Sequence, residues 1–182
     1  LPIWRTDGPL SSMLDVTGDS TSDVEDVVVA TKVRIVPEGG RRPSLGMRFA
    51  TRLPNASNES GLGADTTDFQ TTILVAKTVQ SVRVVGNVGV AFLSDPVRGD
   101  RQNDVVVYGL SFARALTAGA EVVGEINGRW STRPSAPPAG TETRSQARFG
   151  ARYTHGLLRW DAALITGLTT IDAGVGVAAG VT

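Results

Sequence analysis

The chain has no cysteine and a single histidine, so most of the usual chemistry of protein sites lacks the residues it needs. Disulfide frameworks, thiolate metal sites and cysteine nucleophiles are excluded. His155 alone leaves little material for a zinc site or a catalytic triad. No apolar run approaches the ~18 residues of a membrane-spanning helix. We therefore expect no enzymatic activity, no metal and no cofactor.

Charge of either sign is not in surplus either, because 18 basic residues balance 18 acidic ones. A nucleic-acid partner usually requires an excess of lysine and arginine, so we expect none. Aromatic residues make up only 5% of the 182 residues, while 21 glycines interrupt nearly every stretch that could form a helix. The sequence starts with leucine and shows no signal peptide, so we expect a processed or trimmed piece if the protein is exported.

What the sequence does contain is apolar alternation with a period of two residues, which is typical of β-strands. The pattern predicts an all-β protein with about nine strands, most of them roughly nine to eleven residues long, the length of a tilted strand that crosses a bilayer. We expect one domain over residues 1–182, with residues 1–26 as a polar loop segment that leads into the strands. The predicted strands are Val27–Val36, Ser44–Leu53, Phe69–Ala76, Val82–Phe92, Val106–Ala113, Ala120–Trp130, Gln146–Tyr153, Leu158–Leu164 and Gly174–Val181.

The connections between these segments alternate in length. Short turns are expected at Pro37–Pro43, Gln80–Ser81, Leu116–Gly119 and Thr154–Gly156, and longer polar loops separate the other pairs. An antiparallel up-and-down meander with short turns at one rim and long loops at the other is how outer-membrane barrels are built. Sandwiches with Greek-key connections have no reason to keep this order.

The two faces of the predicted strands differ in chemistry. One face carries charged side chains, whose burial in a dry core would cost several kcal/mol per unpaired ion, so we expect this face to line a hydrated lumen. The predicted lumen-lining residues are Lys32, Arg34, Arg48, Arg52, Arg83, Glu121, Glu125, Arg129, Arg148, Arg152, Arg159 and Asp161. Among these, Glu121, Glu125 and Arg129 recur every four residues and are expected to form an interior network.

Every aromatic residue that falls in a predicted strand lies on the other, apolar face. Several of them fall near strand ends, as expected for rings at the two interfaces of a bilayer. A soluble barrel has the same period but the opposite orientation of its faces, and it remains an alternative. The predicted lipid-interface aromatics are Phe69, Phe92, Tyr108 and Trp130 toward the long loops, and Phe112, Tyr153 and Trp160 toward the short turns.

Several segments resemble one family of outer-membrane proteins. They are PSLGMRFATRLPNAS at Pro43–Ser57, GLGADTTDF at Gly61–Phe69, NVGVAFL at Asn87–Leu93, Tyr108-Gly-Leu, and Val123-Gly-Glu125. Together they are similar to the transporter-like barrels grouped as "MetA-pathway of phenol degradation" proteins, over roughly Ser22 to the C-terminus. The resemblance implies a barrel in the outer membrane of a Gram-negative bacterium that passes hydrophobic or aromatic compounds. The terminal aromatic strand usual in such barrels is missing, so we expect a segment of a larger barrel, with Leu1–Arg5 as the tail of another strand.

Most acidic residues fall in the expected long loops, which suggests that divalent cations bridge these loops to lipopolysaccharide phosphates. These acids are Asp15, Asp19, Asp23, Glu25, Asp26, Glu59, Asp65, Asp68, Asp95, Asp100 and Asp104. The acidic stretch at Asp15–Asp26 does not have the spacing of an EF-hand, which favours a solvated loop. The basic surplus of the lumen favours anions, whereas pairing of arginine with glutamate across strands would only stiffen the wall. The two roles are compatible.

The sequence thus favours a passive pore or transporter in the outer membrane, with lipid, lipopolysaccharide and small solutes as partners. Two alternatives stay open: a non-transporting barrel that serves as a subunit or scaffold of an envelope complex, and a soluble barrel that binds a ligand inside. A homo-oligomer also stays open as a partner. His155 is expected in a short turn, away from the long loops, where a phospholipase-type serine could not assist it.

Overall fold

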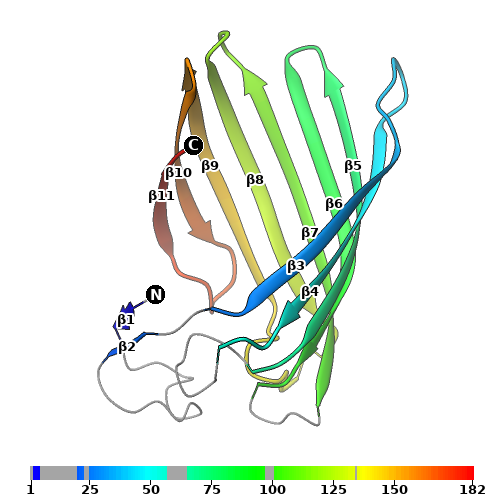
Figure 1. Cartoon of the computed structure of the whole chain (residues 1–182), viewed down its shortest axis with the longest axis vertical. Helices are drawn as coiled ribbons and strands as arrows, with labels where there is room; N and C mark the ends of the chain where they lie inside the picture. Colours follow the sequence, from blue (N-terminus) through cyan, green and yellow to red (C-terminus); the bar gives the residue numbers. More distant parts are fainter. Residues whose placement is uncertain (1, 5–19, 23–24, 57–64, 97–100, 134) are drawn as a thin grey trace.

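The computed structural model describes residues 2–4, 20–22, 25–56, 65–96, 101–133 and 135–182, and these contain strands and no helix. None of the described segments could cross a bilayer as a long apolar helix. The predicted all-β fold is confirmed. Nine strands form one sheet (Figure 1): β3 (Val27–Val36), β4 (Ser44–Leu53), β5 (Asp68–Val79), β6 (Val82–Ser94), β7 (Gln102–Ala115), β8 (Ala120–Ser131), β9 (Arg144–His155), β10 (Leu158–Gly167) and β11 (Val175–Val181).

The strands follow one another in chain order, and each is antiparallel to its neighbours, so the up-and-down meander is confirmed. Several strands are longer than expected, with β7 the longest at 14 residues. β5 to β9 extend past the alternating apolar segments because polar residues at their ends, such as Asp68 and Arg144, still pair in the ladder. The length of a strand depends on which residues pair by hydrogen bonds, whereas apolar alternation marks only the part of the strand with one apolar face.

The connections alternate between two rims, as expected. The short-turn rim carries residues 37–43, 80–81, 116–119 and 156–157; the long-loop rim carries residues 54–67, 95–101, 132–143 and 168–174. At two of the short turns, Gln80 and Gly156 adopt a positive φ, the conformation that tight hairpins require. In Figure 1 the short turns lie at the upper end of the sheet, and the strand ends that the long loops connect lie at the lower end.

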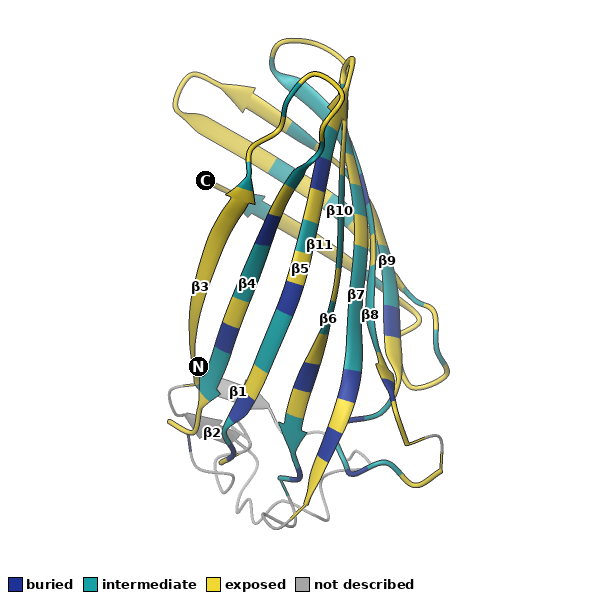
Figure 2. Cartoon of the chain, turned by 90° about the vertical axis from the view of Figure 1, so that its right-hand side faces the viewer, coloured by how far each residue is buried: buried dark blue, intermediate teal, exposed yellow. Residues whose placement is uncertain are grey.

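The sheet curls strongly without closing (Figures 1 and 2). β3 and β11 are its two edges, and neither pairs with a further strand among the described residues. The expectation of a barrel is therefore met only in part, because the structure shows an open, curved, nine-stranded sheet.

A second, two-stranded ladder lies in the segment that the sequence analysis assigned to a polar loop. β1 (Pro2–Trp4) pairs antiparallel with β2 (Ser20–Ser22), and neither joins the nine-stranded sheet. Leu1 and Arg5 lie outside the described residues. The expectation that this stretch belongs to a strand of the large sheet gains no support, since Pro2–Trp4 has its own partner.

Candidate functional site: the inner face of the sheet

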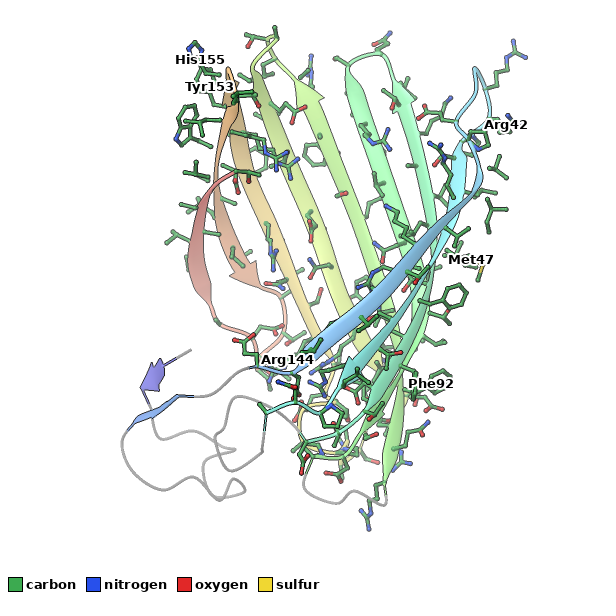
Figure 3. The ribbon with its side chains drawn as sticks, viewed as in Figure 1. Arg42, Met47, Phe92, Arg144, Tyr153 and His155 are labelled. Atoms are coloured by element: carbon green, nitrogen blue, oxygen red, sulfur yellow. The ribbon has the colours of Figure 1, made fainter. Side chains whose placement is uncertain are left out.

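The register places all twelve predicted lumen-lining residues on the same face. Each cross-strand pair joins residues of one face, and the pairing runs without interruption from Lys32–Arg48 on β3 and β4 to Asp161–Gly180 on β10 and β11. This inner face is the concave one, because small residues such as Ala91 and Thr72 on it are buried, at 3% and 4% exposure. In Figure 3, Met47 and Phe92 point away from the hollow of the sheet.

Charges on β8, β9 and β10 compensate one another across the strands. Glu121 lies opposite Arg152, with 4.0 Å between their charged groups, and Arg152 in turn lies opposite Asp161. Glu125 lies opposite Arg148 one step further along. Four of these side chains, together with Arg83, line an open hollow of about 350 Å³: Glu125, Arg148, Arg152 and Asp161. The arrangement stiffens the wall by opposite-charge pairs and keeps the surface of the hollow polar.

The expected network of Glu121, Glu125 and Arg129 is not formed. Residues four positions apart on one strand are separated by roughly 13 Å, and each of the three has a partner elsewhere. Glu121 pairs with Arg152, Glu125 accepts a hydrogen bond from Asn127, and the Arg129 Nε–H donates to the Glu142 carbonyl over 3.0 Å. The partners of these three residues thus lie on β9, two positions away on β8 and in the loop before β9, and not four positions along β8.

Three basic side chains, Lys32 and Arg34 on β3 and Arg48 on β4, have no such compensation. Lys32 and Arg48 lie directly opposite each other, and Arg34 lies opposite Gly46. The positions that face Arg48 on its other side belong to β5, where Thr72 is opposite. None of these three cations forms an ion pair with a described residue. Like charges directly opposite each other destabilise a sheet, so this part of the inner face attracts anionic groups.

At the long-loop rim, Arg52 is the centre of a cluster of polar groups from separate segments. Its guanidinium lies 2.5 Å from the Asp68 carboxylate and 3.8 Å from that of Asp26, and it also donates to the Thr66 hydroxyl. Asp68 also accepts a hydrogen bond from the Ser94 backbone N–H over 2.9 Å. The sequence analysis assigned Asp68 to a loop, but it is the first residue of β5 and faces inward. The cluster ties the segment before β3 and the segment before β5 to the sheet.

The loop at residues 132–143 reaches over the inner face at the same rim. Asn103 on β7, 1% exposed, donates from its Nδ2 to the Ser131 hydroxyl at 2.9 Å and to the Thr141 hydroxyl at 2.8 Å. Gly140 and Thr141 line a hollow of about 110 Å³ together with Arg52 and Asp68. Because Arg52 and Asp68 lie on β4 and β5, this loop narrows the space enclosed by the sheet.

We expect Asn103→Ala to loosen this loop. The substitution leaves the hydroxyls of Ser131 and Thr141 with one partner fewer in a buried position, at a cost of about 1–3 kcal/mol. Limited proteolysis should cut the loop near Arg133 at least several-fold faster than in the unchanged protein. Gln102→Ala, which alters the exposed neighbour on β7, is the matched control and should leave the cleavage rate unchanged. Equal rates in all three proteins would show that Asn103 does not anchor the loop.

The outer face bears the aromatic and large aliphatic side chains, and most of them are exposed. Trp130 is 64% exposed, Phe149 59% and Val177 79%. Phe69 and Phe92 pair across β5 and β6 near the long-loop rim, while Tyr153 and Trp160 stack at 6.1 Å near the short-turn rim (Figure 3 labels Phe92 and Tyr153). The apolar face is therefore the convex one. No cluster of these rings fills the middle of the molecule, since all of them lie on that face.

Tyr108 is the exception among the predicted interface aromatics, because it lies in the middle of β7, opposite Val88. Its ring covers Gly128 on β8, where a Cβ would come within 2.7 Å of the Tyr108 hydroxyl oxygen. Phe112 covers Gly124 on β8 in the same way. Glycine in β8 thus makes room for rings of β7, a packing arrangement that stabilises a sheet locally. The prediction that Tyr108 lies near a strand end is therefore wrong, because β7 already begins at Gln102.

The structure also locates charges on the outer face, which the sequence analysis did not consider. By register they are Lys77, Asp104 and Arg114, and each lies within three residues of a strand end. Between the two rims, the outer positions of all nine strands are uncharged. An uncharged band between charged margins is the distribution expected where a sheet meets the hydrocarbon core of a bilayer.

The turn at residues 37–43 is tied to β5 by one carboxylate. Glu38 accepts a hydrogen bond from the Thr78 backbone N–H at 2.7 Å, and Lys77 and Arg83 approach the same carboxylate at 3.5 Å and 3.6 Å. Lys77 also donates to the carbonyls of Gly39 and Gly40. The Thr78 N–H, helped by Lys77, lowers the pKa of the Glu38 carboxyl below its ordinary value of 4.5.

These contacts predict a loss of stability in acid. A carboxylate whose pKa is lowered by folding stabilises the folded state above its ordinary pKa, and that stabilisation disappears as the pH falls through the lowered value. The Glu38→Gln variant should therefore be less stable than the unchanged protein at pH 7, and the difference should vanish well below pH 4.5. Thermal unfolding followed by circular dichroism over this pH range measures both. A difference that persists in acid would contradict the role of the charge.

His155 ends β9 at the short-turn rim and stacks on Tyr153 at 6.4 Å, away from the long loops, as expected. Within the described part of the chain, no three acidic or histidine side chains gather in a way that could hold a metal ion. The acids of the Asp15–Asp26 stretch lie outside the described residues except for Glu25 and Asp26, as do Glu59 and Asp100.

In comparisons with known proteins, no family model matches the chain and no curated protein matches it.

Proposed function

We propose that this chain forms the wall of a membrane-spanning β-barrel whose outer face meets lipid and whose inner face surrounds a water-filled path. The observation that carries the proposal is the exposed outer face, which is uncharged between the two rims, on a sheet whose charged residues away from the rims lie on the concave side. Soluble proteins rarely expose contiguous apolar surface beyond a few hundred Å². Lipid hydrocarbon would cover such a surface without cost, and strands of 10 to 14 residues in most of the sheet are long enough to cross it.

The second step of the proposal concerns transport. The inner face lined by Arg83, Glu125, Arg148 and Arg152 is polar and hydrated, so solutes would pass by diffusion, with no covalent step. The resemblance to phenol-degradation barrels favours small hydrophobic or aromatic compounds as solutes and the outer membrane of a Gram-negative bacterium as the location. In that setting the loop at 132–143 would form the narrow part of the path.

Conductance in planar lipid bilayers tests the transport step. We expect discrete current steps when the full chain is added to a bilayer, and a larger step for Asn103→Ala because its loop is released. Insertion is checked separately by flotation with lipid vesicles. A chain that floats with vesicles but never conducts would overturn transport and leave the scaffold role in an envelope complex. A chain that stays in solution without detergent would overturn the membrane proposal altogether.

A soluble ligand-binding barrel is favoured by no observation of the inner face. Such a barrel needs an apolar interior for an apolar ligand, whereas the hollow against β8 to β10 carries the charged side chains of Glu125, Arg148 and Arg152.

A further inference from the structure

The two free edges of the sheet run in the same direction. β3 and β11 are the first and the ninth of nine strictly antiparallel strands, so they are parallel to each other. Pairing them directly would require a parallel contact, whereas antiparallel closure requires an odd number of additional strands between them. Open edges do not occur in lipid, because each unpaired N–H or C=O group costs several kcal/mol there. Some strand must therefore cover each edge of a membrane-spanning form.

The charges on β3 indicate which side chains a strand paired with its free edge would need. Every residue of β3 except the last is exposed, and its inward positions include Lys32 and Arg34. Their neighbours on the paired side are Arg48 and Gly46, so no carboxylate on β4 balances them. The unpaired side of β3 is thus the place from which compensation can come. The inward positions of β11 are instead Gly176, Ala178 and Gly180, which prefer no charge.

We propose that the free edge of β3 is the docking site of an antiparallel β-strand with carboxylates at its inward positions and apolar residues at its outward ones. Only the apolar outward positions rest on the membrane function proposed above; the carboxylates follow from Lys32 and Arg34 alone. A second copy of this chain is not the occupant. Antiparallel pairing of β3 with β3 of another copy would leave Lys32 and Arg34 uncompensated in every register, because β3 contains no acidic residue.

Designed peptides test the proposal on the full chain in detergent micelles. The probe is a fluorescent ten-residue peptide (a length of about that of β3) that alternates valine with glutamate, and its match alternates valine with lysine. Two cross-strand charge pairs should make the glutamate peptide bind about tenfold more tightly, as measured by anisotropy. Lys32→Glu with Arg34→Glu should invert this preference, and Lys32→Gln with Arg34→Gln should abolish it. Equal affinities in the unchanged chain would overturn the proposal.

The absence of native cysteine allows the docked edge to be located. A cysteine at an outward position of the glutamate peptide should form a disulfide with Thr31→Cys on β3 and not with Ala179→Cys on β11, two outer-face positions in the middle of the edge strands. Cross-linking to β11 alone, or a Thr31→Cys dimer without peptide, would overturn the assignment. Failure of conductance leaves these results unaffected, so a failure of the transport function and a failure of this docking site are distinguishable.

Discussion

Arginine in place of Val88 is expected to prevent the protein from entering a lipid bilayer. Val88 lies at the centre of β6 on the outer face, is 52% exposed, and has Ile73 and Tyr108 opposite it on the two neighbouring strands. Arginine on the lipid side at the middle of a bilayer costs about 2–4 kcal/mol. Folding into phosphatidylcholine vesicles, followed by the shift in electrophoretic mobility during a urea titration, should therefore show a folded fraction reduced at least tenfold.

The adjacent residue supplies a control at the same depth. Asn87 points inward, opposite Leu74 and Gly109, so Asn87→Arg places the same charge on the concave face, which we propose is water-filled. Its folded fraction should stay within about twofold of the unchanged protein, because a lumen substitution leaves the lipid contact intact. If Asn87→Arg were the more damaging variant, the two faces would be assigned the wrong way round. If Val88→Arg simply raised solubility without detergent, the outer face would be facing water.

The sequence predicted most of the fold because alternation and register constrain each other. A slip of one residue would move every side chain of a strand to the other face, so the pattern in residues such as Val88 and Arg148 also fixes which face each strand presents. Loop lengths then predicted the two rims. The residues at strand ends could not be predicted in this way. Asp68 and Arg144 are polar and lie beyond the apolar alternation, yet they pair in the sheet.

Contacts between distant segments could not be predicted from the sequence. The loop at 132–143 meets β7 through Asn103 and Thr141, which are 38 positions apart and show no shared pattern. The expected network on β8 failed for a related reason, since spacing along one strand says nothing about the residues opposite. Arg129 is directed to Glu142 by the path of the loop. The openness of the sheet is likewise a property of the edges, on which alternation within a strand has no bearing.

Reversal of the charge at Arg48 is expected to change the ion selectivity of the proposed pore. Arg48 is half-buried on the inner face beside Lys32 and has no carboxylate partner among the described residues, so it contributes a full positive charge to the path. Arg48→Glu removes that charge and adds a negative one that pairs with Lys32. A change of about one kT in the interior potential alters the ratio of anion to cation permeability roughly sevenfold, because the two ions respond in opposite directions. The reversal potential across a salt gradient should therefore shift in the direction of greater cation permeability.

Substitutions at Arg148 on β9 test whether selectivity depends on the net charge of the inner face or on the position of one arginine. Arg148→Glu alone should shift selectivity in the same direction, but it would place two carboxylates opposite each other because Glu125 is its cross-strand partner. The swap Arg148→Glu with Glu125→Arg restores the pair and the net charge, so it should leave the reversal potential where it was. Arg42→Glu, in the turn outside the sheet, should have little effect for lack of contact with the path (Figure 3). An unchanged potential in Arg48→Glu would mean that ions do not pass along this face.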